Sequence, residues 1–289
     1  MKSKAFIKRI KSFNVINGLI ILLLCFLTLY PLWFVIVASF SDGAALLQGK
    51  VSFWPIGATL ENYRVLFEYS MIKRAYLNTL LYVTLGIIAS MVLTVLAAYP
   101  LSRPEFKARK IMSFYVAFTM LFNGGIIPTY IVVQGVGLID TIFGLFLPVA
   151  LSAFNVIVLR TFIQTVPEEM TEAAKIDGCG YFRILLKVIM PCAFAGMMTI
   201  LLFYIVGHWN TFMPGILYIV ARPELLPMQN ILRKIVINEE SIGTGISDQN
   251  IAKGVRYATV AITVLPVIIV YPFMQKYFQK GMMIGSLKG

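Results

Sequence analysis

The side chains that could carry out chemistry are few in this sequence, and they stand far apart. His208 is the only histidine, and no acidic residue lies within one helical turn of it. Cys25, Cys179 and Cys192 lack the spacing of a metal site, and we interpret them as reduced thiols without a role. The chain has no GxxxxGK[ST] phosphate loop, no G-x-S-x-G elbow and no pair of carboxylates in an apolar run. We therefore expect no catalytic site, metal or cofactor, so the chain is not an enzyme on its own.

A polar stretch between two apolar runs, from Glu168 to Pro191, carries the most ordered pattern in the chain. Thr165 stands three residues before Glu168, which is the spacing of a capping box, and Pro167 suits a first helical turn. Acidic residues follow at once, near the positive end of the predicted helix, where negative charge is favoured.

The next residues predict a reversal into a second short helix. Ala173 and Ala174 give the first helix a small face that another surface can approach closely. Gly178 and Gly180 end this helix, because glycine adopts the backbone angles that a reversal needs. Residues 181–189 form a second, amphipathic stretch. The pattern therefore indicates a helix–turn–helix that binds another protein. We expect the contact to involve Glu168, Glu169, Glu172, Ala173, Ala174, Asp177, Gly178 and Pro191.

The composition is that of a membrane protein. Of 289 residues, 59% are hydrophobic and 13% are charged, with a mean hydropathy of +0.83, whereas about a quarter of the residues of a soluble domain are charged. The net charge of +12 would suit nucleic acid in a soluble protein, but basic loops also orient membrane proteins. We expect contact with membrane lipid and none with nucleic acid.

Six apolar runs predict an all-α membrane protein with six transmembrane helices, because in lipid each backbone polar group must be satisfied within its segment. The runs lie at about residues 15–40, 77–101, 111–133, 143–162, 193–212 and 257–278. The first is too long for a signal-peptide core and lacks an A-x-A-like cleavage site. Six spans put both termini on one side, which holds 16 of the 25 basic residues. Cytosolic loops are rich in Lys and Arg, so both termini and the 163–191 loop should be cytosolic.

Polar residues within the spans allow two interpretations each. Asn123, in a third span interrupted by 124–125 and Pro128, faces either a translocation path or a neighbouring helix. Aromatic and amide groups also gather in the outer half of the fifth span, at Tyr204, His208, Trp209 and Asn210. They suit a sugar, whose C–H faces stack while its hydroxyls need hydrogen-bond partners, and they equally suit an interfacial belt. For His208 alone, a polar group at a helix end is the plainer interpretation.

Glu172-Ala173-Ala174, then Gly178, then Val188-Ile189-Met190-Pro191 resemble the EAA loop of permease subunits of bacterial ABC importers. The family pattern is EAA, three residues, Gly, nine residues and I-x-L-P, so Val188 and Met190 are conservative departures. The order of the segments and the closing residues 280–289 resemble the carbohydrate-uptake, maltose-type branch. The resemblance covers nearly the whole chain.

This resemblance implies a type I ABC importer permease fold in the bacterial cell membrane. The implied divisions are a cytosolic N-terminus (1–14), the first transmembrane helix and outer loop (15–76), a permease core (77–278) with the EAA coupling loop (163–191) and an outer loop (213–256), and a cytosolic tail (279–289). A second permease subunit, in a heterodimer rather than a homodimer, would complete the translocation path. Two ATPase subunits would bind ATP and Mg and dock on the coupling loop. An extracytoplasmic solute-binding protein would meet the outer loop at charges such as Arg222 and Glu239.

The implied function is import of a sugar, an oligosaccharide or a polysaccharide, and three alternatives stay open. The importer could carry a solute other than sugar. A channel or receptor-like protein would more typically carry a repeated pore motif or rings of like charge, and neither occurs here. An intramembrane enzyme would need a set of catalytic residues, and this sequence shows none. Uptake that requires ATP separates the transporter from the last two.

Overall fold

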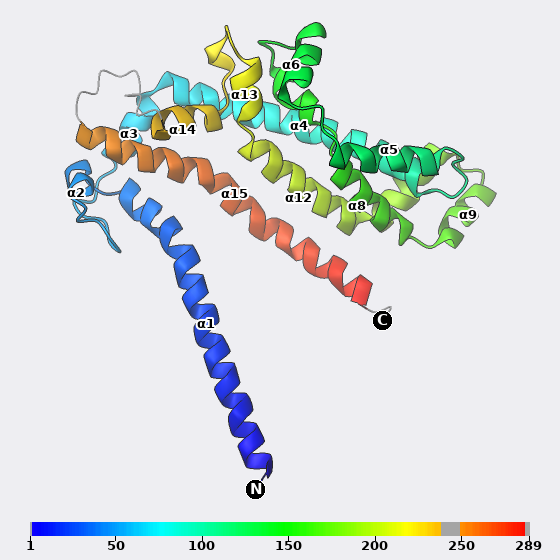
Figure 1. The fold of residues 1–289 in the computed structure, drawn as a ribbon, viewed down its shortest axis with the longest axis horizontal. Helices are drawn as coiled ribbons and strands as arrows, with labels where there is room; N and C mark the ends of the chain where they lie inside the picture. Colours follow the sequence, from blue (N-terminus) through cyan, green and yellow to red (C-terminus); the bar gives the residue numbers. More distant parts are fainter. Residues whose placement is uncertain (1, 238–248, 287–289) are drawn as a thin grey trace. The chain divides into compact units, whose positions relative to one another are not determined.

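The computed structural model describes the backbone of residues 2–237 and 249–286, and the side chains of residues 13–236 and 253–273. Within these residues the chain forms helices and connections without a strand (Figure 1). Three helices are each long and apolar enough to cross a membrane, and three bent pairs of helices pass the same test together. The prediction of an all-α protein with about six spans is therefore confirmed. The basic side chains predicted at both termini, and Glu239 and Glu240 of the predicted outer loop, lie outside the described residues.

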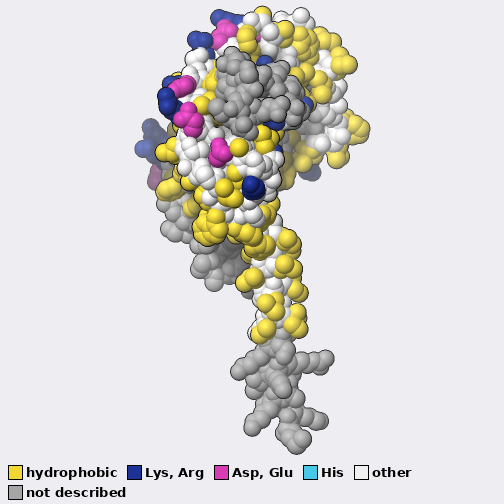
Figure 2. All heavy atoms as spheres, turned by 90° about the vertical axis from the view of Figure 1, so that its left-hand side faces the viewer, with side chains coloured by type: hydrophobic (Ala, Val, Ile, Leu, Met, Phe, Trp, Pro, Cys, Tyr) yellow, Lys and Arg dark blue, Asp and Glu magenta, His cyan; other side chains and the backbone are white. Residues whose placement is uncertain are grey.

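The three long helices correspond to the first, second and sixth predicted spans. They are α1 (Lys2–Ser39), α4 (Ser70–Ser102) and α15 (Gln249–Ser286). The apolar part of α1, Phe13–Ser39, has a mean hydropathy of 2.7 and is almost entirely unburied. Figure 2 shows hydrophobic side chains along this helix, a surface that suits lipid. α4 begins earlier than predicted, because the residues before Leu77 continue the helix instead of closing the preceding loop.

The third predicted span is two helices rather than one interrupted helix. α5 (Arg109–Leu121) and α6 (Ile126–Gly135) are bent by 116° from each other. Gly125 has a φ of +89° at the bend, which only glycine adopts readily. Pro128 does not interrupt α6, because it lies in the first turn of this helix, where a missing N–H leaves no helical hydrogen bond unmade.

The fourth predicted span is also bent, and the fifth follows a bend at its start. α7 (Ile142–Phe146) and the 3₁₀ turn η1 (Leu147–Val149) meet α8 (Ala153–Gln164) at 57°. Ser152 begins α8 as its N-cap, with an extended backbone and a side-chain oxygen that accepts the Asn155 N–H. α12 (Phe194–Asn210) follows the 181–192 segment at a bend of 85°.

The chain forms two compact units, residues 1–69 with 234–264 and residues 70–233 with 265–289. In the first, α2 (Gly43–Leu47) and α3 (Glu61–Glu68) occupy the segment predicted as the outer loop after the first span. Asn62, 3% exposed, donates hydrogen bonds to the carbonyls of Ser39 and Ser41 at 3.0 and 2.9 Å. These bonds satisfy carbonyls that the end of α1 would otherwise leave unpaired.

In the second unit, α4, α8 and α12 lie side by side (Figure 1) and enclose its core. Glycines let these helices approach closely: an added Cβ on Gly86 would lie 3.1 Å from both the His208 ring and Phe146. On Gly196 it would collide with the Phe162 ring. Close approach through small residues is how helices associate in lipid, where apolar burial gives little gain.

Candidate functional site

The first helix of the polar stretch is α9 (Glu168–Ile176), with Glu168 and Glu169 in its first turn. The predicted capping box is wrong. Thr165 is the C-cap of α8 and its hydroxyl donates to the Phe162 carbonyl, while Pro167 is the N-cap of α9 without a side-chain hydrogen bond. The N-cap of α9 lies two residues beyond Thr165, so this side chain is too early in the chain to cap it.

The predicted reversal at Gly178 is present. Gly178 has a φ of +78°, its N–H donates to the Lys175 carbonyl at 3.0 Å, and the Cys179 N–H donates to the Ala174 carbonyl at 2.9 Å. This pair of bonds is a Schellman motif, which requires a left-handed residue after the C-cap. Gly180 differs from the prediction, because it is extended with a φ of −70° and serves as the N-cap of α10.

The second helix runs through three segments without a break in sequence: α10 (Tyr181–Ile184), the π-helix η2 (Leu185–Ile189) and α11 (Met190–Cys192). The π segment stands directly before Pro191, which is exposed. Proline removes one N–H and crowds the carbonyl four residues earlier, so a locally widened helix relieves both effects.

Polar contacts attach α9 to the end of α4. Arg103 donates to the hydroxyl of Thr171 at 3.3 Å, and Thr171 is only 4% exposed. The Arg103 guanidinium also lies over the Tyr99 ring, 5.0 Å from its centroid. Lys175 forms an ion pair with Glu105. This hydrogen bond lowers the pKa of the Glu105 carboxyl and raises the pKa of the Lys175 amine. α9 is therefore held to the helix that enters the membrane.

The predicted contact residues divide into two sets. Glu168, Glu169, Glu172, Ala173, Asp177 and Gly178 are exposed. Ala174 instead packs against the core of the second unit, so the two alanines do not form one open face. Large apolar side chains add to the exposed surface: Ile176 is 86% exposed and Phe182 is 65% exposed. Sequence reasoning missed these two, although apolar residues inside a polar stretch are a signal for them.

A polar seam joins α4 to α12. Ser90 and the Nε2 atom of His208 are 2.9 Å apart, and the hydroxyls of Thr94 and Tyr204 are 2.6 Å apart. Tyr82 donates to the backbone carbonyl of His208 at 2.6 Å. His208 lies in the last turn of α12 and is 4% exposed, so its interpretation as a polar group at a helix end holds, with its side chain buried against Ser90 of α4.

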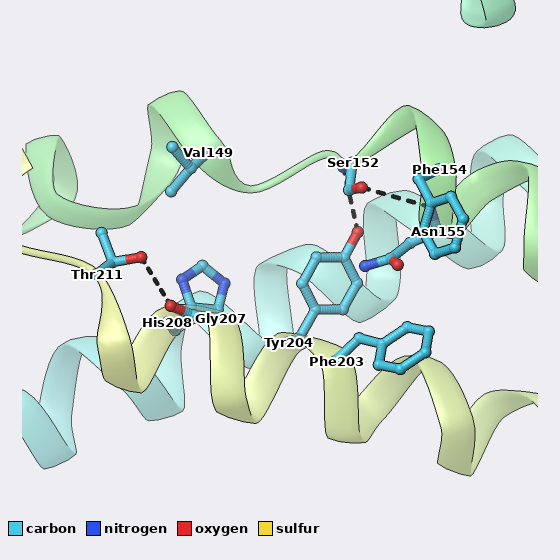
Figure 3. A pocket seen from close by; sticks show the side chains of 9 residues that line it. All are labelled: Val149, Ser152, Phe154, Asn155, Phe203, Tyr204, Gly207, His208 and Thr211. Carbon is cyan, nitrogen blue, oxygen red and sulfur yellow. Dashed lines mark hydrogen bonds between the residues drawn. The ribbon is translucent and has the colours of Figure 1, made fainter. Parts of the chain in front are cut away.

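A pocket of about 370 Å³ opens beside this seam, between the start of α8 and the C-terminal half of α12 (Figure 3). Tyr204 and His208 are part of its wall, together with Asn155 and Phe203. The Tyr204 hydroxyl accepts the Ser152 N–H at 3.3 Å, which ties the start of α8 to α12. Two of the predicted path residues are therefore brought together around one cavity.

The other three predicted path residues lie apart from this pocket. Trp209 is 4% exposed and meets the Tyr76 ring edge to face, with centroids 6.0 Å apart. Asn210 is exposed at the end of α12. Asn123 lies at the bend between α5 and α6, where its side-chain oxygen accepts the Gly125 N–H at 2.8 Å. This bond gives Asn123 a local role in shaping the bend.

The predicted outer loop contains ordered elements within its described part: α13 (Met213–Tyr218), a 3₁₀ turn η3 (Pro223–Leu225) and α14 (Met228–Ile237). Asp140 fixes the irregular connection before η3. Its carboxylate accepts the N–H groups of residues 220, 221 and 222 at 2.7, 2.9 and 3.2 Å. Asp140 itself has a φ of +53°, which aspartate tolerates better than most residues.

Sequence reasoning missed the α4 side of the seam. Tyr82, Gly86, Ser90 and Thr94 recur every four residues in an otherwise apolar run, which places them on one face of a helix. That spacing was the available signal. Asn155 and Ser152 carried a second signal, since a serine three residues before another polar residue suits a helix start.

The chain is similar to known proteins along nearly its whole length. The family model described as binding-protein-dependent transport system inner membrane component matches residues 83–284. The chain is 37% identical to the polygalacturonan/rhamnogalacturonan transport system permease protein YtcP of Bacillus subtilis, with 100% of both chains covered. It is 37% identical to the protein LplC of the same organism, over 91% of this chain and 90% of that protein.

One solved structure matches closely in fold. It is the crystal structure of a bacterial ABC transporter involved in the import of the acidic polysaccharide alginate. The TM-score is 0.87 at 32% identity, with 93% of this chain and 97% of that chain covered.

Proposed function

The chain belongs to the family of binding-protein-dependent transport system inner membrane components, and from this premise we propose that it is the permease subunit of an ATP-driven importer for fragments of an acidic polysaccharide. The observation that carries the proposal is the full-length likeness, in sequence and in fold, to transporters whose names give polygalacturonan and alginate as cargo. Polymers of this kind are built from uronic acids. Sugar import is therefore favoured over import of another solute.

The helix–turn–helix of α9 and α10 is the proposed coupling site. Two backbone hydrogen bonds close its Schellman turn, and Arg103 and the Lys175–Glu105 pair hold α9 to the turn that directly follows α4. A partner that moves α9 would thus move a membrane helix as well. In this proposal Glu172 and Asp177 meet basic groups of a separate ATPase, and exposed Ile176 fills an apolar recess on it. ATP and Mg bind to that ATPase, and none of the chemistry occurs in this chain.

The remaining partners follow from the same proposal. A second permease subunit completes the path, and an extracytoplasmic solute-binding protein, which the family description names, delivers the cargo. It docks near η3, where Asp140 holds the backbone in one arrangement. We assign both termini and the α9–α10 turn to the cytosol of a bacterial cell, because their side carries 16 of the 25 basic residues.

Uptake by proteoliposomes that contain the complete importer tests the proposal. Trigalacturonate loaded on the binding protein should accumulate when ATP is enclosed, and should not accumulate with ADP. A peptide mixture of similar size serves as the non-sugar control. Equal uptake with ATP and with ADP would indicate a channel, and uptake of peptide in place of sugar would contradict the assignment of cargo.

A further inference from the structure

The pocket between α8 and α12 has the chemistry of a binding site for one sugar residue. Its volume of about 370 Å³ falls at the small end of the range of ligand sites. Two helices of the second unit form it. The Tyr204 hydroxyl accepts the Ser152 N–H and shares a hydrogen bond with the Thr94 hydroxyl, and these bonds fix the Tyr204 side of the wall. The cavity is therefore a feature of the folded unit itself.

The Asn155 side chain is a polar group in the pocket wall that is available to a ligand. The residue is only 5% exposed, and within the described part of the chain its carboxamide makes no hydrogen bond. Figure 3 shows the carboxamide beside the Tyr204 ring, on the cavity side of α8. Buried amides in proteins are nearly always paired, and this one offers two N–H donors and one acceptor. Adjacent hydroxyls of a pyranose ring match that arrangement.

Aromatic rings form the apolar part of the wall. Phe154 and Phe203 lie with their centroids 6.1 Å apart, and they are 51% and 42% exposed. Rings that stay exposed in the folded unit can stack on the C–H face of a sugar. The pocket thus combines an apolar face with an unpaired amide, as a pyranose requires.

The electrostatics of the pocket favour a negative sugar. None of the described residues in its wall carries a charge, so no carboxylate repels an anion. The start of α8 adds a positive potential, because the N–H groups of Ala153 and Phe154 have no partner within the helix. Ser152 accepts the Asn155 N–H, which leaves its own hydroxyl hydrogen for a ligand oxygen.

We propose that this pocket is a subsite for one hexuronate residue of the transported oligosaccharide. The Asn155 carboxamide binds ring hydroxyls, Phe203 stacks on the C–H face, and the carboxylate lies toward the first turn of α8. This chain then touches the cargo itself. The inference rests on the proposed function, since only an importer would bring an oligosaccharide to this cavity.

Binding of radiolabelled trigalacturonate to the purified, complete importer in nanodiscs tests the subsite. Asn155→Leu should weaken binding about tenfold, the effect of losing one or two hydrogen bonds. Asn155→Asp keeps the shape but adds a negative charge, so it should weaken binding of trigalacturonate more than binding of neutral galactotriose. Phe203→Ala should weaken both. Phe194→Ala is the matched control, because Phe194 is on the same helix, 43% exposed, and outside the pocket wall.

The outcomes separate the subsite from the function on which it rests. Each variant is first checked for intact assembly by size-exclusion chromatography. If assembled Asn155→Asp and Phe203→Ala importers bind trigalacturonate as the wild type does, the subsite is refuted while ATP-driven uptake by the wild type still upholds the importer. If Asn155→Asp weakens binding of trigalacturonate and of galactotriose equally, the preference for an acidic residue is refuted. Absence of ATP-driven sugar uptake by the wild type would overturn the function and the subsite together.

Discussion

Replacing Gly178 by a residue with a side chain should uncouple ATP hydrolysis from transport. Gly178 ends α9 with a φ of +78°, and its N–H and the next one close the Schellman turn. No atom lies within 4 Å of an ideal Cβ at this position, so substitution causes backbone strain without a collision. The effect of Gly178→Ala therefore reports the backbone strain in this turn alone, without a steric clash.

The size of the effect follows from the left-handed conformation. An L-residue other than glycine loses about 1–2 kcal/mol there, which changes the ratio of closed to open turns by a factor of about 5–30. Asparagine tolerates this region better than alanine, so Gly178→Asn should fall between alanine and the wild type. Gly180 is a matched control, because its Cβ would also meet open space but its φ is −70°.

The assay is the number of ATP molecules hydrolysed per sugar transported, in proteoliposomes with the complete importer. Gly178→Ala should raise this number several-fold, Gly178→Asn should raise it less, and Gly180→Ala should leave it unchanged. Gly178→Trp should give an inserted, assembled protein that hydrolyses ATP with little uptake. Normal coupling by Gly178→Trp, or equal defects at both glycines, would refute the role assigned to this turn.

Three further predictions concern the parts that hold the site. Asp140→Ala removes a carboxylate that accepts three N–H groups, so amide hydrogen exchange at 220–222 should quicken about tenfold, as expected for the loss of about 1.4 kcal/mol; unchanged exchange would show that the loop needs no anchor. Glu105→Gln should lower the melting temperature at neutral pH. The lysine partner lowers the pKa of Glu105. The difference in melting temperature between the wild type and Glu105→Gln should therefore be full above about pH 4.3 and disappear as the pH falls through that lowered pKa. A difference that persists in acid would contradict the ion pair. Gly86→Ala crowds the α4–α12 contact and should cost about 1–3 kcal/mol in thermal unfolding, whereas Gly135→Ala, which meets no atom, should be neutral.

Much of the fold was predictable because the patterns that specify it are local. Long apolar runs predicted the spans, and Gly178 predicted the reversal, since a left-handed cap is a property of a few neighbouring residues. The bends in the third and fourth spans were less visible. Asn123 and Gly125 marked the third as interrupted, but the angle of 116° depends on packing beyond the turn.

The details of the site depend on partners that are distant in sequence. His208 looked isolated because its hydrogen-bond partner Ser90 lies 118 residues away, and Tyr204 pairs with Thr94 over 110 residues. Ala174 looked like part of an open face, but the core of the second unit covers it. Local patterns identify such residues as notable, and only the packed helices show what they face.

The composition of the particle that contains this chain tests the central claim most directly. The tagged chain is purified from its native membrane in mild detergent, and the intact particle is weighed by native mass spectrometry. We predict one copy of this chain with one second permease and two ATPase subunits, and a binding protein that joins when sugar is present. A chain that stays alone in several detergents, with no ATPase bound, would contradict it.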